Sequence, residues 1–128
     1  MIVRHRKDLL KTKNHAVGDV WSSTRFFIKI DDLGFSFHET IIKANSVQKM
    51  WYKNHTEAVI ISKGKAEIEN VATGEIFPLE EGSAYVLTGD KHIFRTFTEV
   101  VCYCVFNPPL EGDETHDSDG SFPLSKED

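Results

Sequence analysis

The stretch EAVIISKGKAEIENVATGEIFPL, residues 57–79, decides the fold. It contains three short runs rich in β-branched side chains, separated by a Lys-Gly turn at 63–64 and an Ala-Thr-Gly turn at 72–74. Short runs divided by glycine turns are typical of antiparallel strands in a β-sandwich or β-barrel. The stretch therefore predicts an all-β chain.

The same spacing continues on both sides of this stretch. Only the segment near Lys7 to Lys11 favours a short helix. No internal repeat and no second domain is visible in the 128 residues, so one domain over 1–128 is expected. The other predicted strands are 25–30, 35–42, 50–52, 83–87, 92–97 and 99–106.

The composition of the chain changes after Phe106. The sequence Asn-Pro-Pro at 107–109 ends the last strand, because proline has no N–H for the ladder. Residues 107–128 contain few apolar side chains and are expected to form a C-terminal tail. The apolar segment 122–124 within it suggests that the tail closes over the barrel.

Charge and composition exclude several classes of function. A net charge of −5 and a pI near 5.6 argue against nucleic-acid binding. No apolar run approaches the roughly 18 residues of a membrane span, and the N-terminus lacks the apolar core of a signal peptide. Cys102 and Cys104 lie too close in sequence for an ordinary structural disulfide. Reduced thiols in a cytoplasmic protein are the expectation.

The strand predicted at 35–42 has two different faces. Ser36, His38 and Thr40 share one face, whereas Phe35 and Phe37 share the other. One face could meet a packed core between sheets and the other a polar cavity. Solvent on the polar side explains the alternation equally well, so the strand alone leaves both open.

Among six histidines, spacing selects two for chemistry. His55 and Glu57 are two residues apart and share a strand face, and His92 begins a later strand. Together with the glycine and proline turns at 64, 78 and 82, they indicate donors directed into a barrel. Nitrogen and carboxylate donors suit iron, manganese, nickel or zinc. A metal-free binding barrel is the alternative.

Four long motifs resemble the ectoine synthases, a family of cupins. WYKNHTEAVIISKGKAEIENVATGEIFPLEEGSAYVL (51–87) and VFNPPLEGDETHDSDGSFPL (105–124) are the most specific of them. DVWSSTRFF (19–27) and GFSFHETII (34–42) are similar to earlier blocks of the family. The resemblance covers about residues 1–124.

The resemblance implies a jelly-roll-like cupin β-barrel with a short N-terminal segment. It also implies cyclising dehydration of a small-molecule substrate, N-γ-acetyl-L-2,4-diaminobutyrate, to ectoine, with Fe(II) as the metal and a homodimer as the assembly. The implied metal ligands are Glu57, Tyr85 and His92. The implied catalytic residues are Tyr52, His55, Glu114 and His116, and the implied substrate-binding residues are Trp21, Arg25, Thr40, Cys104 and Phe106.

These residue types suit the chemistry that the resemblance implies. An arginine such as Arg25 binds a carboxylate through two parallel hydrogen bonds. His55, His116 and Glu114 are the candidates for the proton transfers. Plainer interpretations exist for single residues: Trp21 could be a core aromatic, and Arg25 a surface residue.

One segment departs from the family pattern. Residues 87–92 read Leu-Thr-Gly-Asp-Lys-His, which is one residue shorter than the family's usual stretch and lacks its first histidine. A change in the length of a turn costs little free energy, so His92 can still enter its strand in register. Two alternatives therefore stand beside an ectoine synthase: a paralogue that acts on another small amino-acid-derived substrate, and a cupin that only binds a small ligand.

Overall fold

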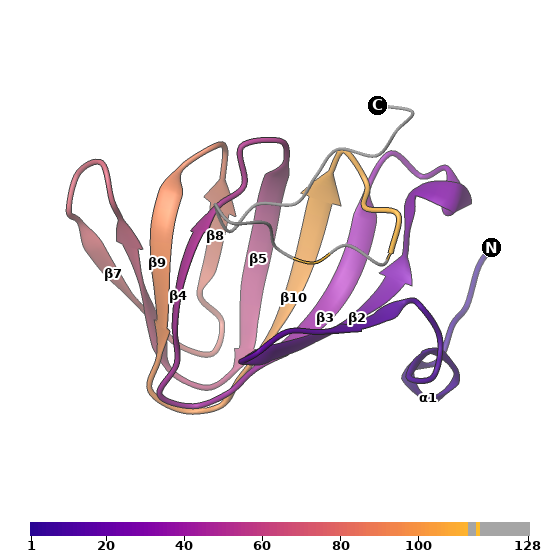
Figure 1. Ribbon diagram of the computed structural model, residues 1–128, viewed down its shortest axis with the longest axis horizontal. Helices are drawn as coiled ribbons and strands as arrows, with labels where there is room; N and C mark the ends of the chain where they lie inside the picture. Colours follow the sequence, from indigo (N-terminus) through magenta and orange to yellow (C-terminus); the bar gives the residue numbers. More distant parts are fainter. Residues whose placement is uncertain (113–114, 116–128) are drawn as a thin grey trace.

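The protein, described here by a computed structural model, consists of two facing β-sheets with little helix (Figure 1). The structure describes residues 1–112 and Thr115. The predicted all-β class is confirmed. The elements are α1 (Arg6–Leu9), β1 (His15–Val17), β2 (Trp21–Phe27), the 3₁₀ helix η1 (Lys29–Asp31), β3 (Ser36–Ile42), β4 (Val47–Trp51), β5 (Thr56–Lys63), β6 (Ala66–Asn70), β7 (Ile76–Leu79), β8 (Ala84–Leu87), β9 (Lys91–Thr96) and β10 (Val100–Asn107).

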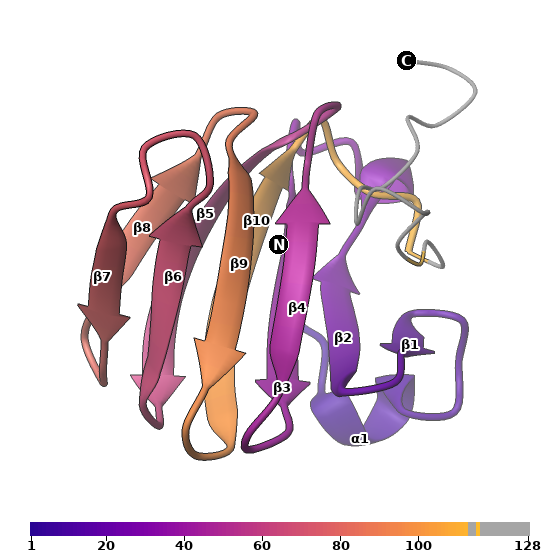
Figure 2. The same cartoon turned by 60° about the vertical axis from the view of Figure 1, so that its left-hand side comes forward.

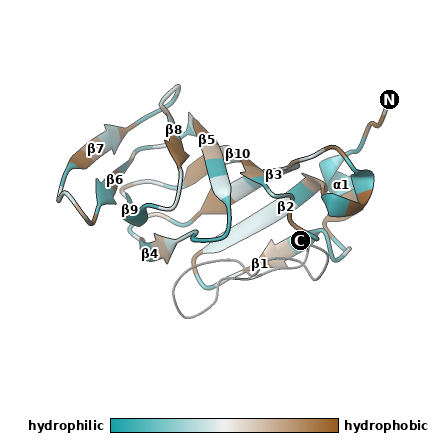
Figure 3. Cartoon of the chain, turned by 90° about the horizontal axis from the view of Figure 1, so that it is seen from above, coloured by the Kyte–Doolittle hydropathy of each residue, from teal (hydrophilic) through white to brown (hydrophobic). Residues whose placement is uncertain are grey.

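All strand pairs are antiparallel. One sheet has the order β1-β2-β3-β10-β5-β8, and the other has the order β4-β9-β6-β7. Figure 2 shows the second sheet in front of the first, and Figure 3 shows the two sheets from above, along opposite sides of the molecule. In the part of the chain that the structure describes, no helix is long and apolar enough to cross a membrane.

Strand β10 lies in the middle of the larger sheet. It pairs with β3 on one side and with β5 on the other, so its backbone is hydrogen-bonded along both edges. Its side chains alternate strictly, with Cys102, Cys104 and Phe106 buried and the residues between them only partly buried. The buried side chains face Phe94 of the opposite sheet within one apolar cluster. The core therefore lies between the sheets, on the inner face of β10.

The turn at 63–64 takes the predicted form. Gly64 has a φ of 99°, in the left-handed region that favours glycine. A Cβ atom at this position would lie 2.2 Å from the carbonyl oxygen of Glu99. Glycine is thus required both by the backbone conformation and by the close approach of a neighbouring segment.

The structure settles the orientation of β3. His38 is 2 % exposed and faces the space between the sheets, whereas Phe35 and Ile41 on the other face are 38 % and 36 % exposed. The polar face is therefore the inner one. Among residues 1–112, no second sheet covers the apolar face, so the expectation of a core between sheets on that side is wrong.

The strand predicted at 25–30 ends early. Strand β2 stops at Phe27, because the chain turns into η1. The carboxylate of Asp31 accepts a hydrogen bond of 2.9 Å from the backbone N–H of Ile28. It also accepts two hydrogen bonds of 2.7 Å from the terminal nitrogens of Arg4. A local side-chain hydrogen bond competes here with the sheet, which the residue types alone do not reveal. The strand β1 and the first half of β2 were not predicted.

Helix α1 is tied to the outer face of the larger sheet by an ion pair. The guanidinium of Arg6 donates two hydrogen bonds of 2.6 Å to Glu39, and the hydroxyl of Tyr103 donates a third at 2.8 Å. Burial alone would raise the pKa of Glu39, but the hydrogen bonds from Arg6 and Tyr103 and the charge of Arg6 outweigh it. The net pKa of Glu39 is lowered, so its ionised form stabilises the fold.

We expect Glu39→Gln to lower the free energy of unfolding by about 1–2 kcal/mol at pH 7. The pKa of Glu39 is lower in the folded chain, so its contribution is present above the unfolded pKa of about 4.3 and is lost as the pH falls through the folded value. Urea unfolding at pH 7 and near pH 3 measures this difference, which should shrink at the lower pH. The exposed Glu80→Gln is the control, and an equal loss in both variants would contradict the expectation.

Candidate active site

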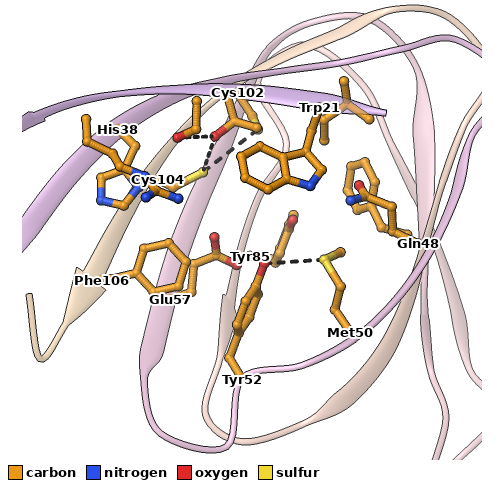
Figure 4. A pocket seen from close by; sticks show the side chains of 15 residues that line it. Trp21, His38, Gln48, Met50, Tyr52, Glu57, Tyr85, Cys102, Cys104 and Phe106 are labelled. Carbon is orange, nitrogen blue, oxygen red and sulfur yellow. Dashed lines mark hydrogen bonds between the residues drawn. The ribbon is translucent and has the colours of Figure 1, made fainter. Parts of the chain in front are cut away.

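A cavity lies between the two sheets, and most of the predicted site residues meet there (Figure 4). Its wall comes from strands of both sheets, including β2, β3, β5 and β10 from the larger sheet and β4 and β9 from the smaller one. Eight predicted residues line it: Trp21, Arg25, Thr40, Tyr52, Glu57, Tyr85, Cys104 and Phe106.

Strand register explains why these side chains converge. Glu57 of β5 lies opposite Phe106 of β10, and Val59 lies opposite Tyr85 of β8. Glu57 and Tyr85 are therefore diagonal neighbours on the same inward face. The adjoining pairing of β3 with β10 brings Thr40 opposite Cys102 on that face.

Arg25 is an interior residue and not a surface one. Its side chain belongs to β2, opposite His38 of β3, and only 1 % of the residue is exposed. A guanidinium keeps its charge even when buried, so it makes the cavity attractive to an anion. Burial first, and then the charges of Arg25 and His55, lower the pKa of His38 well below its usual value. His38 is therefore neutral and adds no second positive charge beside Arg25.

The oxygen donors of the cavity are held in an apolar setting. Burial raises the pKa of Glu57 well above its usual value, and the neighbouring Cys104 raises it further. Burial, followed by the charge of Glu57, likewise raises the pKa of Tyr85. Both groups therefore favour their protonated forms in the chain alone. A cation between them would reverse this preference, because it stabilises the anionic forms.

His92 and His55 are buried beside the cavity rather than in its wall. The ring of His92 lies 5.6 Å from the ring of Tyr52, and the ring of His55 lies 5.8 Å from that of Phe106. The Nδ1 atom of His92 is 3.0 Å from the carbonyl oxygen of Asp90, which can only accept. Nδ1 therefore carries the proton, and Nε2 keeps the lone pair that a metal ion requires.

The shortened segment before His92 is well anchored. Gly89 turns the chain with a φ of 95°, and its carbonyl oxygen accepts the indole N–H of Trp51 at 2.9 Å. The carboxylate of Asp90 accepts the N–H of Thr88 at 3.0 Å. The loop thus reaches β9 with His92 facing inward, as the sequence predicts.

The donor set fits an iron-type ion only if a tyrosine takes part. Among residues 1–112 and 115, no group of three or more His, Cys, Asp or Glu side chains is arranged to hold a metal. The set Glu57, Tyr85 and His92 contains two oxygen donors and one nitrogen donor, which suits a borderline divalent ion. The residues present are compatible with such an ion, and the phenol of Tyr85 is the donor on which the site depends.

Several cavity residues were not among the predicted site residues. His38 and Cys102 lie in the wall, as do Ser23, Gln48 and Met50. Alternation could have identified Ser23, His38 and Cys102. Ser23 shares a strand face with Trp21 and Arg25, His38 shares one with Thr40, and Cys102 shares one with Cys104. The same spacing links Gln48 and Met50 to Tyr52, which follows them by four and two residues. The predicted residues Glu114 and His116 lie outside the described residues, as does the predicted tail at 113–114 and 116–128.

Comparisons with known proteins agree with this geometry. A family model described as "Ectoine synthase" matches residues 1–126. The L-ectoine synthase of Oceanobacillus iheyensis is 46 % identical over 128 residues, covering 99 % of this chain and 100 % of that protein. The L-ectoine synthase of Desulfosudis oleivorans is also 46 % identical, over 129 residues, with the same coverage.

Solved structures show the same fold. The crystal structure of ectoine synthase from P. lautus superposes with a TM-score of 0.86 at 39 % identity, covering 100 % of this chain and 96 % of that chain. The Cupin_2 domain of a transcriptional regulator from Enterobacter cloacae superposes with a TM-score of 0.59 at 18 % identity, covering 71 % and 99 %. The second likeness concerns the fold alone and supports the predicted cupin architecture.

Proposed function

The chain belongs to the ectoine synthase family, and we propose that it closes N-γ-acetyl-L-2,4-diaminobutyrate into the cyclic amidine ectoine, with loss of water. It is an enzyme of the hydro-lyase type that acts on a small molecule. The observation that carries this function is the convergence of Arg25, Glu57 and Tyr85 in one buried cavity. Their charges and donors match what the reaction needs.

The paralogue and the non-catalytic binder are not favoured. The curated relatives are synthases over the full length of this chain, and the shortened loop still delivers His92 to the interior. A barrel that only binds a ligand would also have no need for a buried carboxylate, a buried and a partly buried phenol, and a fixed histidine tautomer beside one cavity.

Arg25 binds the substrate carboxylate in this proposal. A buried guanidinium can donate two parallel hydrogen bonds, which fix both the position and the direction of the carboxylate. Trp21 and Phe106 supply flat apolar walls on the same cavity. Walls of this kind hold a flexible chain bent, so that its amine lies near its own amide carbon.

The reaction forms one bond between the α-nitrogen and the acetyl carbon, and the acetyl oxygen leaves as water. The α-ammonium must first lose a proton, which a largely apolar and buried cavity favours because it destabilises the charged form. His55 and Tyr52 are the described residues proposed for the proton transfers. The predicted Glu114 and His116 complete this set.

Glu57, Tyr85 and His92 would hold the metal, for which Fe(II) is the first expectation and Mn, Ni or Zn are alternatives. When bound, such an ion supplies Lewis acidity toward the amide oxygen. The chain's own part is to present the three donors. Strands β5 and β8 direct the two oxygens inward, and the hydrogen bond from His92 to Asp90 orients the imidazole.

A homodimer in the cytoplasm completes the proposal. The outer face of the larger sheet carries exposed apolar side chains on adjacent strands, with Ile60 of β5 48 % exposed and Val86 of β8 59 % exposed. Such a face is suited to a second copy of the chain. The free thiols of Cys102 and Cys104 fit a reducing compartment.

We expect the purified, iron-loaded protein to convert N-γ-acetyl-L-2,4-diaminobutyrate into ectoine, because the cavity binds, bends and deprotonates this substrate. Chromatography follows the product, and a chelated sample should lose turnover that added iron restores. If a folded, iron-loaded sample formed no ectoine, the proposed substrate would be wrong.

Removing a metal donor should weaken iron binding strongly. We expect Glu57→Gln and His92→Ala to bind iron about 100-fold more weakly or worse, since even outer-shell changes cost about 10- to 100-fold. Iron content after dialysis measures this effect without reference to turnover. The exposed Glu80→Gln and His5→Ala are matched controls, and iron retention equal to theirs would overturn the ligand assignment.

A charge on the outer face of the larger sheet should break the dimer. We expect Ile60→Glu to run as a monomer in light scattering after gel filtration, because dimerisation would bury an unpaired carboxylate. Val47→Glu, at an exposed position of β4 in the other sheet, should stay dimeric. A dimer in both variants would place the interface elsewhere.

A further inference from the structure

Two thiols lie side by side in the cavity wall. Cys102 and Cys104 are both free and only 3 % and 4 % exposed, and both line the cavity. Their Sγ atoms are 3.9 Å apart, and the Cys104 thiol lies 3.9 Å from the hydroxyl oxygen of Thr40 (Figure 4). The proposed reaction uses Cys104 as a wall residue and gives Cys102 no role.

The extended geometry of β10 disfavours a disulfide bond between these two thiols. Two residues along an extended strand advance about 6.6–6.8 Å, the upper limit of the Cα separations that a disulfide spans, about 4.4–6.8 Å. Strand β10 is hydrogen-bonded to β3 and to β5, so its backbone cannot contract. The sulfur atoms would have to approach from 3.9 Å to about 2.05 Å.

One thiophilic atom bonded to both sulfurs fits their separation of 3.9 Å better than a direct sulfur–sulfur bond does. Two sulfur ligands of one tetrahedral zinc ion, with bonds of about 2.3 Å, lie about 3.8 Å apart. A metal ion, however, needs further donors, and the described residues contain no group of three His, Cys, Asp or Glu side chains arranged for one. A trivalent organoarsenical needs only two sulfurs, because its third bond is to carbon.

We propose that Cys102 and Cys104 form a dithiol site that binds a trivalent organoarsenical in the cavity. With phenylarsine oxide as the reagent, two arsenic–sulfur bonds form and the arsenic–oxygen bond breaks. The two thiol protons leave with that oxygen as one molecule of water. Arsenic stays trivalent, so no oxidant or reductant is required. Any effect on turnover rests on the proposed function, whereas formation of the adduct does not.

Intact-mass spectrometry of the folded protein with phenylarsine oxide tests the site. We expect one phenylarsenic group per chain and the loss of both titratable thiols. 2,3-Dimercaptopropanol should reverse the adduct, whereas 2-mercaptoethanol at the same thiol concentration should not, because only a dithiol replaces both bonds at once. A folded protein that takes up no arsenical, or that keeps a titratable thiol in the adduct, would overturn the proposal.

Variants at Cys102 separate a dithiol from a single reactive cysteine. In Cys102→Ser and Cys102→Ala, the second arsenic–sulfur bond is lost, so the half-saturating concentration should rise about 100-fold or more. Thermal unfolding shows which of the two variants is folded. An unchanged half-saturating concentration in a folded variant would contradict the proposal. If neither variant folds, thiol titration and reversal in the unaltered chain decide the question.

Discussion

The double ladder of β10 is the constraint on which the rest of the structure depends. Because the strand is paired on both edges, every second side chain has a fixed direction, and a shift of one residue would turn Cys102, Cys104 and Phe106 outward. The same ladders fix the neighbours, so that His38 of β3 and Glu57 of β5 also face inward. One set of backbone hydrogen bonds thus builds the core and the cavity together.

The cavity is lined by ionisable side chains that are rare in an apolar core. Arg25 and Glu57 are buried and Tyr85 is partly buried, and their surroundings raise the pKa values of Glu57 and Tyr85. Ionisable groups with strongly shifted pKa values gather at functional sites, so their presence indicates a use in binding and chemistry. An anionic substrate would place an opposite charge beside the guanidinium of Arg25, and a cation between Glu57 and Tyr85 would stabilise their anionic forms.

The loop before His92 is held by hydrogen bonds that do not belong to the sheets. The segment at 88–90 is tied by Trp51 and by its own Asp90, and the carbonyl oxygen of Asp90 also orients the imidazole. These contacts lie at the end of the strands, where the ladder does not depend on the number of loop residues. In this chain the loop places His92 in the interior, with Nδ1 directed at the carbonyl oxygen of Asp90.

The sequence by itself determined the all-β class, most strands, the glycine turn at 63–64 and the end of β10, because these follow from local residue types and alternation. Its motifs also indicated eight of the residues that line the cavity. Only the tertiary structure decided that the His38 face is the inner one, that Arg25 is buried, and that β2 gives way to η1. Alternation divides a strand into two faces but does not say which face meets a second sheet. That Gln48 and Met50 reach the cavity likewise depends on how the two sheets are placed against each other.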